Sequence, residues 1–135
     1  MSRPTLYRWF PSKEHLLEAF GAHEQAKYDA GLAAAIASVS PAKRLDAILR
    51  FIVEFQHTYS MRHIVDIEPE HALHQMQSVL PIMRDRLVPY FPGRGGVVAA
   101  TVVVRVALSH LLIRDDDPDL FLRELRAAAG LHKRS

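Results

Sequence analysis

The stretch that most limits how this chain can fold is its most apolar run, Val97 to Ile113, whose only polar members are Thr101, Arg105, Ser109 and His110. A membrane-spanning helix needs about 20 apolar residues, so the run is too short and too polar to cross a bilayer. A helix that is apolar all round must instead be buried on both sides. We therefore predict that one side faces the chain's own bundle and the other faces a second copy.

The rest of the chain reads as further helices around this run. No segment alternates at period two for long enough to form a strand, and 135 residues with 49% apolar content suffice for one domain with a real core. The sequence predicts an all-α helical bundle. Its expected helices cover residues 12–38, 41–60, 68–91, 97–113 and 117–130, with a short helix or loop over 61–67.

Two of these expected helices carry glycine or proline inside them. Pro81 should kink or split the helix over 68–91 near Leu80. Gly21 and Gly31 lie within the helix over 12–38 and mark either flexible points or close packing against a neighbour. The inward stripe of that helix is expected at Leu16, Leu17, Phe20, His23, Ala26, Lys27, Ala30 and Ala34, and that of the helix over 68–91 at Leu73, Met76, Leu80, Met83, Leu87 and Tyr90.

The first twenty residues begin with a short helical segment that lies between Pro4 and Pro11. Leu6 and Phe10 share one helical face, and Arg3 and Tyr7 share another. Pro11 ends this short helix, and Ser12 is placed to cap the next one. Three basic residues, Arg3, Arg8 and Lys13, precede the first acid in the sequence. A short capped helix with basic, Thr, Tyr and Trp side chains suits phosphates and base edges.

The run Ser2-Arg3-Pro4-Thr5-Leu6-Tyr7-Arg8-Trp9-Phe10-Pro11-Ser12-Lys13-Glu14, followed by Leu16-Leu17, closely resembles the recognition helix and following turn of TetR-type bacterial transcriptional repressors. The resemblance implies a helix-turn-helix whose second helix enters the major groove. It implies that Arg3, Pro4, Thr5 and Trp9 face the bases and that Tyr7 and Lys13 bind backbone phosphates. It divides the chain into residues 1–17, a remnant of the DNA-binding domain, and residues 18–135, a ligand-binding and dimerisation domain in the cytoplasm.

The sequence departs from that family at its start, where members carry two further helices and this chain has only Met1. We expect either a misassigned start or a truncated relative, with DNA binding impaired in this chain and retained in a full-length form. In the family the last two helices of each subunit pair in the dimer, which here implies Val97–Ile113 and Asp119–Gly130. The alternative function is a helical ligand-binding or dimerising protein with no DNA role, which pairs with full-length relatives.

Adaptable apolar side chains on two of the expected helices suit a pocket. These are Phe51, Phe55, Tyr59, Met76 and Met83, and His110 is a polar group on the apolar run that could orient a ligand. The other interpretation of the same residues is ordinary core packing. By resemblance, repressors of this type bind a small apolar ligand between these helices.

Enzyme and metal chemistry find little support in the sequence. The absence of Cys excludes disulfides and thiolate sites, and neither a phosphate-cradling glycine motif nor a Gly-x-Ser-x-Gly elbow occurs. His71 and His74 share a helical face, but a metal needs three or four ligands. The acidic run at residues 115–117 reads as a turn and a helix cap. We therefore predict a binding protein that uses no cofactor and no metal and is not an enzyme.

Overall fold

The computed structural model of the chain describes residues 11–58, 64–114 and 117–131. Within these ranges the structure is entirely helical and has no strand, which confirms the prediction of an all-α bundle. The α-helices are α2 (Lys13–Ile36), α3 (Arg44–His57), α4 (Ile64–Ile67), α5 (Pro69–Leu87), α6 (Gly96–Leu112) and α7 (Pro118–Ala128), and two 3-10 turns, η1 (Pro41–Lys43) and η2 (Val88–Tyr90), precede α3 and follow α5.

Most helix starts follow the local signals in the sequence. The Ser12 hydroxyl caps α2 by accepting from the backbone N–H of His15 at 3.2 Å. Asp117 caps α7 by accepting from the backbone N–H groups of Asp119 and Leu120, and Pro118 takes the first helical position. Ser40 differs from expectation, because it precedes Pro41 but its side chain makes no capping hydrogen bond.

Helix α5 continues through Pro81, where the sequence predicted a kink or a split. A proline cannot donate to the carbonyl four residues earlier, which here belongs to Gln77. Both Gln77 and Pro81 are exposed, so water can satisfy that carbonyl and the helix need not break. The helical conformation ends close to the predicted residue 91, because after Leu87 the chain tightens into η2, which ends at Tyr90.

The expected inward stripe of α2 was wrong, because Phe20 is 41% exposed and Ala30 faces solvent, whereas Glu24 and Tyr28 are buried. Helix α2 therefore buries a face rotated from the expected one.

The expected stripe of α5 is largely confirmed, since Leu87 is buried and Leu80, Met83 and Tyr90 pack against the core. Its first member, Leu73, is 52% exposed, and the neighbouring Ala72 is buried in its place.

Both glycines in α2 lie at close approaches. A Cβ built on Gly31 would lie 2.7 Å from the ring of Phe51 in α3, and one on Gly21 would meet the side-chain amide of Gln75 in α5. Close packing is therefore the interpretation that the structure supports for these two positions, since no Cβ fits there without a shift of the neighbour.

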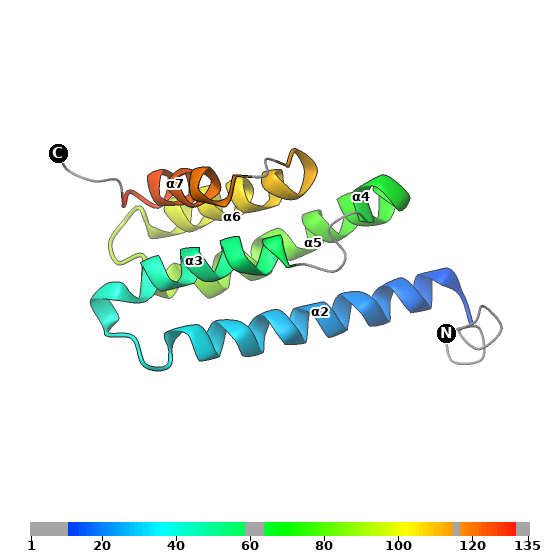
Figure 1. Ribbon diagram of the computed structural model, residues 1–135, viewed down its shortest axis with the longest axis horizontal. Coiled ribbons are helices and arrows are strands. Elements are labelled where there is room, and N and C mark those ends of the chain that lie inside the picture. Colours follow the sequence, from blue (N-terminus) through cyan, green and yellow to red (C-terminus); the bar gives the residue numbers. More distant parts are fainter. Residues whose placement is uncertain (1–10, 59–63, 115–116, 132–135) are drawn as a thin grey trace.

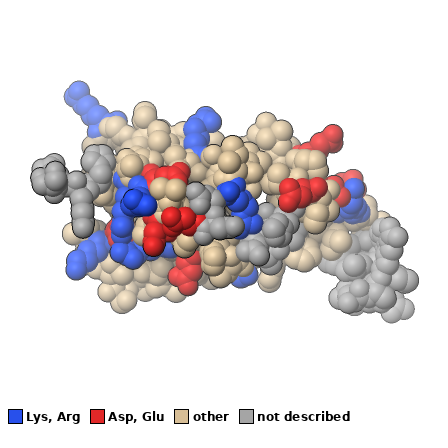
Figure 2. All heavy atoms as spheres, turned by 45° about the horizontal axis from the view of Figure 1, so that its top comes forward, with Lys and Arg blue, Asp and Glu red and all other residues tan. Residues whose placement is uncertain are grey.

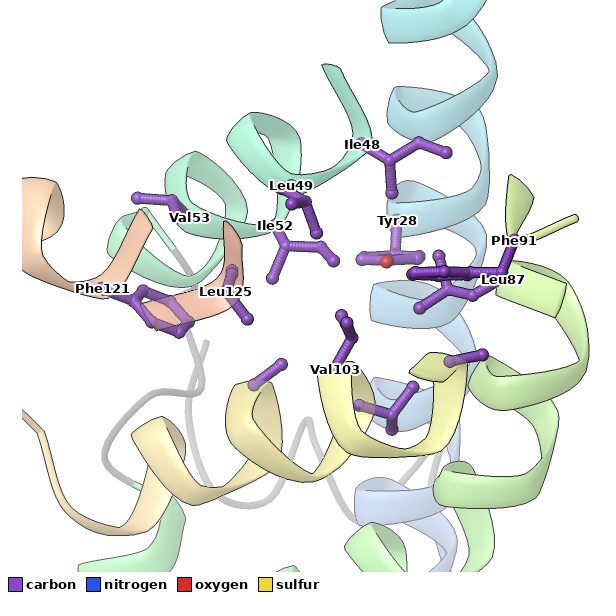
Figure 3. Packing of buried hydrophobic residues seen from close by; sticks show 13 residues of the cluster. Tyr28, Ile48, Leu49, Ile52, Val53, Leu87, Phe91, Val103, Phe121 and Leu125 are labelled. Atoms are coloured by element: carbon purple, nitrogen blue, oxygen red, sulfur yellow. The ribbon is translucent and has the colours of Figure 1, made fainter. Parts of the chain in front are cut away.

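The helices run roughly along one axis, with α2 on one long side and α6 and α7 on the other (Figure 1). Helix α2 packs on α3, α3 on α7, α7 on α6, and α6 on α5. The core lies between them, where Tyr28 meets Leu87 and Phe91 at one end and Phe121 and Leu125 meet α3 at the other (Figure 3).

One side of helix α6 packs into the chain's own bundle, as its composition predicted. It buries Ala100, Val103, Val104 and Ala107 on the inner face. Despite this apolar content, none of the helices in the described ranges is both long and apolar enough to cross a membrane.

Candidate functional site

A pocket of about 170 Å³ lies where α2 and α3 face α5 and α6. Its walls come from four long helices and the short helix α4, so residues far apart in the sequence meet there. The lining residues are Gly21, Glu24, Gln25, Tyr28, Ile52, Phe55, Gln56, Ile64, Val65, Ala72, Gln75, Met76, Val79, Met83, Leu87, Val104, Ala107, Leu108 and Leu111. The walls are mostly apolar, which is the usual character of a small-molecule site.

Helix α5 supplies the longest wall of the pocket. Ala72, Met76, Val79, Met83 and Leu87 line it at steps of three and four residues, so they form one continuous helical face. The two methionines are flexible and polarisable, which lets this wall adapt to the shape of a bound molecule.

Among the described residues that line the pocket, Glu24 alone is charged. Its side chain is 7% exposed, and Oε2 lies 3.9 Å from the ammonium of Lys27, a side chain that is more than half exposed. A charged group out of water is costly unless opposite charge or hydrogen-bond donors meet it. Glu24 is therefore the strongest polar feature of an otherwise apolar wall.

Gln56 is the buried amide of the opposite wall, and its hydrogen bonds join the pocket to α6. Its Nε2 donates to the carbonyl of Ala107 at 2.8 Å, and its Oε1 lies 3.0 Å from Nδ1 of His110. Because the amide nitrogen is the donor to Ala107, the oxygen accepts from a protonated Nδ1. The His110 ring stacks on Phe121 of α7 with 3.7 Å between centroids, so one chain of contacts runs from the pocket to α7.

Tyr28 lines the pocket and also packs against the aromatic rings of Phe51 and Phe55. Its ring lies 5.2 Å from that of Phe51 and 5.1 Å from that of Phe55, centroid to centroid. Burial raises the pKa of the Tyr28 hydroxyl well above its usual range. The hydroxyl therefore stays neutral, and it adds no charge to the pocket.

The predicted pocket residues divide into three groups. Phe55, Met76 and Met83 line the pocket. Phe51 packs behind Tyr28, and His110 lies behind Gln56, so both support lining residues without lining the pocket themselves. Tyr59 falls outside the described residues.

Sequence reasoning missed the polar members of the pocket, Glu24, Gln56 and Tyr28. Gln56 follows the buried Ile52 and Val53 at helical spacing, and that position was the one sequence signal for a buried amide. Glu24 gave no signal, because a glutamate inside a helix is most simply read as solvated.

Of the residues expected to contact DNA, Arg3, Pro4, Thr5, Tyr7 and Trp9 lie outside the described residues. Lys13 is the first residue of α2, and its ammonium lies 3.0 Å from the carboxylate of Glu68. That contact joins the start of α2 to the start of α5, at the end of the bundle where α4 lies (Figure 1).

The histidines that invited a metal hypothesis lie on α5, where His71 is half-buried and His74 is exposed. Across residues 11–58, 64–114 and 117–131 there is no group of three His, Cys, Asp or Glu side chains that could hold a metal ion.

Comparison with known proteins yields no match: no family model, no curated protein and no solved structure matches this chain.

Proposed function

We propose that this chain is the ligand-binding and dimerisation part of a TetR-type transcriptional regulator, a cytoplasmic repressor that works as a homodimer and is not an enzyme. The observation that carries the proposal is the position of α2. This helix begins at Lys13, directly after the segment that resembles a recognition helix, and eleven residues later it supplies Glu24 to the pocket wall.

Helix α2 connects the proposed DNA-binding segment with the pocket, so a movement of the helix at the pocket is transmitted to that segment. Helix α2 crosses the expected domain boundary at residues 17 and 18 without a break. A small apolar ligand that enters between α2 and α5 would shift one helix relative to the other. In a dimer, that shift changes the spacing of two recognition segments and releases the DNA.

The outer face of α6 supports the homodimer. Val98 is 68% exposed and Val102 is 40% exposed, and Val97, Leu112 and Ile113 are exposed on the same helix. Such apolar surface is costly in water and usually marks an interface. A second copy of the chain is the simplest partner for this surface, because two-fold symmetry brings the same apolar stripe of each subunit to the interface.

Helix α7 adds less to this expected interface than α6 does. It buries Phe121 and Leu125 inside its own bundle and exposes Asp119, Arg123 and Glu124.

On the face shown in Figure 2, Lys and Arg alternate with Asp and Glu and do not gather into a basic surface. The proposed DNA contacts therefore rest on the residues before α2 and on Lys13.

The dimer is tested by light scattering on the purified chain. We expect the mass of a dimer for the natural sequence and of a monomer for Val102→Arg, because a second cation beside the exposed Arg105 of the same face adds like-charge repulsion where the two copies would meet. Leu73→Arg is the matched control, since Leu73 is also an exposed apolar residue but lies on α5. A monomeric natural chain, or equal effects of the two variants, contradicts the proposed interface.

The DNA role is tested by a gel-shift assay with DNA from upstream of the chain's own gene, at several salt concentrations. We expect sequence-dependent binding that weakens as the salt concentration rises, because the proposed recognition segment reads base edges and its basic residues contact phosphates. Arg3→Ala and Trp9→Ala should abolish the preference over unrelated DNA. Equal binding to both DNAs by the natural chain refutes the regulatory proposal and favours a ligand-binding protein without a DNA role.

A further inference from the structure

We propose that the pocket binds an uncharged molecule of about one aromatic ring that carries a hydroxyl group, and that the side-chain amide of Gln75 forms the hydrogen bond to this hydroxyl. The inference rests on the proposed function, because it names the class of ligand for the same pocket. It depends on the volume of the pocket, on the position of Gln75 in its wall, and on the internal partners of the other polar lining side chains.

The volume of the pocket sets the size of the ligand. An apolar protein cavity of about 150 Å³ accommodates benzene. The pocket here has about 170 Å³, so it admits one ring with a short side arm. The rings of Tyr28 and Phe55 both line the pocket and meet each other edge to face, and an aromatic ligand can pack against them in the same way.

Gln75 lies on the face of α5 that forms the longest wall, one turn after Ala72 and one turn before Val79. Its amide extends to α2 and lies against Gly21, since a Cβ built on Gly21 would collide with Nε2 of Gln75. Because glycine has no side chain, α2 leaves room for the amide at this point. Gln75 is half-buried, so its amide is within reach of a molecule that enters the pocket.

The other amide and carboxylate side chains of the lining have partners within the protein. The pairs are Gln56 with Ala107 and His110, Gln25 with Asp29, and Glu24 with Lys27. Among the residues that the structure describes, by contrast, none forms a hydrogen bond with the Gln75 side chain. An amide offers two N–H donors and a carbonyl acceptor, and a hydroxyl group can pair with either. Gln75 is therefore the lining amide that is available to a ligand.

The Tyr28 hydroxyl is the other polar group that a ligand could contact. It is neutral, and it lies close enough to Arg86 and Asp29 to be influenced by both charges. Tyr28 follows Gly21 by two helical turns on α2, so it lies roughly 10 Å along the helix from the contact with Gln75. We assign the ligand hydroxyl to Gln75, because Tyr28 already has two charged neighbours and packs in the aromatic cluster.

The lining favours an uncharged ligand. A charge that leaves water needs an opposite charge or several hydrogen bonds. Among the described residues of the lining there is no Lys or Arg, and the carboxylate of Glu24 is already paired with Lys27. A hydroxyl group costs less to bury than a charge does, and one hydrogen bond from Gln75 offsets much of that cost.

The test compares benzyl alcohol with ethylbenzene, which has nearly the same shape and lacks the hydroxyl. Each is titrated into the isotope-labelled full chain and followed by amide NMR spectra. We expect Gln75→Met to weaken the binding of benzyl alcohol roughly fivefold, which is the usual net effect of one hydrogen bond. The binding of ethylbenzene should be unchanged or tighter, because methionine has a similar length and is apolar. Equal changes for the two ligands overturn the inference.

The NMR spectra also locate the ligand directly. In the natural chain the side-chain N–H signals of Gln75, identified by their loss in Gln75→Met, should shift with benzyl alcohol and much less with ethylbenzene. Gln77→Met is the matched control, because Gln77 is an exposed glutamine of α5 outside the pocket, and it should leave both affinities unchanged. An equal loss of benzyl alcohol binding in both methionine variants overturns the inference.

Two further variants separate the role of Gln75 from stability and from Tyr28. Gly21→Ala places a methyl group where the Gln75 amide lies, so it should weaken benzyl alcohol more than ethylbenzene while the fold stays intact. Equal effects on the two ligands would contradict the position of the amide beside Gly21. Tyr28→Phe should leave the affinity for benzyl alcohol nearly unchanged. If Tyr28→Phe weakens benzyl alcohol and Gln75→Met does not, the hydroxyl binds Tyr28 and the inference is overturned.

The charge of the ligand is tested with benzylamine and benzoate, which are charged near neutral pH. Both should bind more weakly than benzyl alcohol, and tighter binding of either one overturns the inference.

The outcomes separate this inference from the proposed function. If benzyl alcohol and ethylbenzene bind and Gln75→Met affects them equally, the ligand class is wrong and the pocket still binds ligands. If benzyl alcohol binds as expected but the chain shows no preference for promoter DNA, the regulatory proposal fails and the ligand class stands. If no probe binds, the inference is overturned, and the gel-shift assay by itself decides the DNA role.

Discussion

Two glycines ten residues apart on α2 should respond oppositely to the same substitution. In a helix interior, Gly→Ala stabilises by about 1 kcal/mol through helix propensity. At Gly21 the new methyl group meets only the amide end of the Gln75 side chain, which can turn away. Gly21→Ala should therefore raise the free energy of unfolding by nearly the full amount.

At Gly31 the new methyl group would lie 2.7 Å from the Phe51 ring. That ring cannot retreat freely, because the Tyr28 and Phe55 rings lie 5.2 Å and 5.8 Å away, centroid to centroid. Overpacking of this kind costs about 1–3 kcal/mol, which cancels or exceeds the gain in propensity. Gly31→Ala should be less stable than Gly21→Ala by about 1–3 kcal/mol.

The assay is urea unfolding followed by far-ultraviolet circular dichroism, at one protein concentration because dimerisation affects stability. Phe51→Leu in the Gly31→Ala background supplies the control, since a smaller side chain should relieve the contact and produce a non-additive gain. If both alanine variants are stabilised equally, the close packing of α2 on α3 at Gly31 is refuted.

Three further predictions concern the packing of α7. Arg126 donates to the Asp46 carboxylate from Nε at 2.7 Å and lowers the pKa of Asp46. The stabilisation from a lowered pKa is fully present above the unfolded value of about 3.9 and is lost as the pH falls through the folded value. Arg126→Ala should therefore cost at most about 1 kcal/mol in urea unfolding near neutral pH, and progressively less as the pH is lowered through the folded pKa of Asp46. Leu125→Ala removes a fully buried side chain and should cost about 2–5 kcal/mol in the same assay; a loss below about 1 kcal/mol would show that α7 is not docked. Asp117→Ala should cost about 1 kcal/mol through the lost cap and Asp117→Asn much less, and equal losses would contradict the capping role.

The sequence predicted the helical class and most boundaries because those features depend on local chemistry. Ser12, Pro41 and the pair Asp117-Pro118 act on the backbone within one turn, so their effect is the same in any surrounding fold. The buried face of α3 can also be predicted from the sequence, since Ile48, Leu49, Ile52 and Val53 are strongly apolar and recur at helical spacing. The resemblance of the first residues to a recognition helix, with the function it implies, stays a prediction.

The face that each weakly amphipathic helix buries was decided by tertiary structure. Helix α2 is rich in alanine and has no dominant apolar stripe, so the sequence could not show that it turns Glu24 and Tyr28 inward. The sequence likewise could not show that α5 continues through Pro81. The helix is not split there, because the carbonyl that lacks its hydrogen bond lies at an exposed position where water can reach it. Both outcomes depend on what lies opposite the helix, which local spacing does not encode.

By itself, the sequence determined the all-α class and where most helices begin, and the cover of the outer face of α6 by a second copy stays a prediction. Only the tertiary structure decided that a buried carboxylate and two methionines share one pocket. A capping or apolar residue acts on neighbours along the chain, whereas a pocket is a relation between helices that the packing of the whole core brings together.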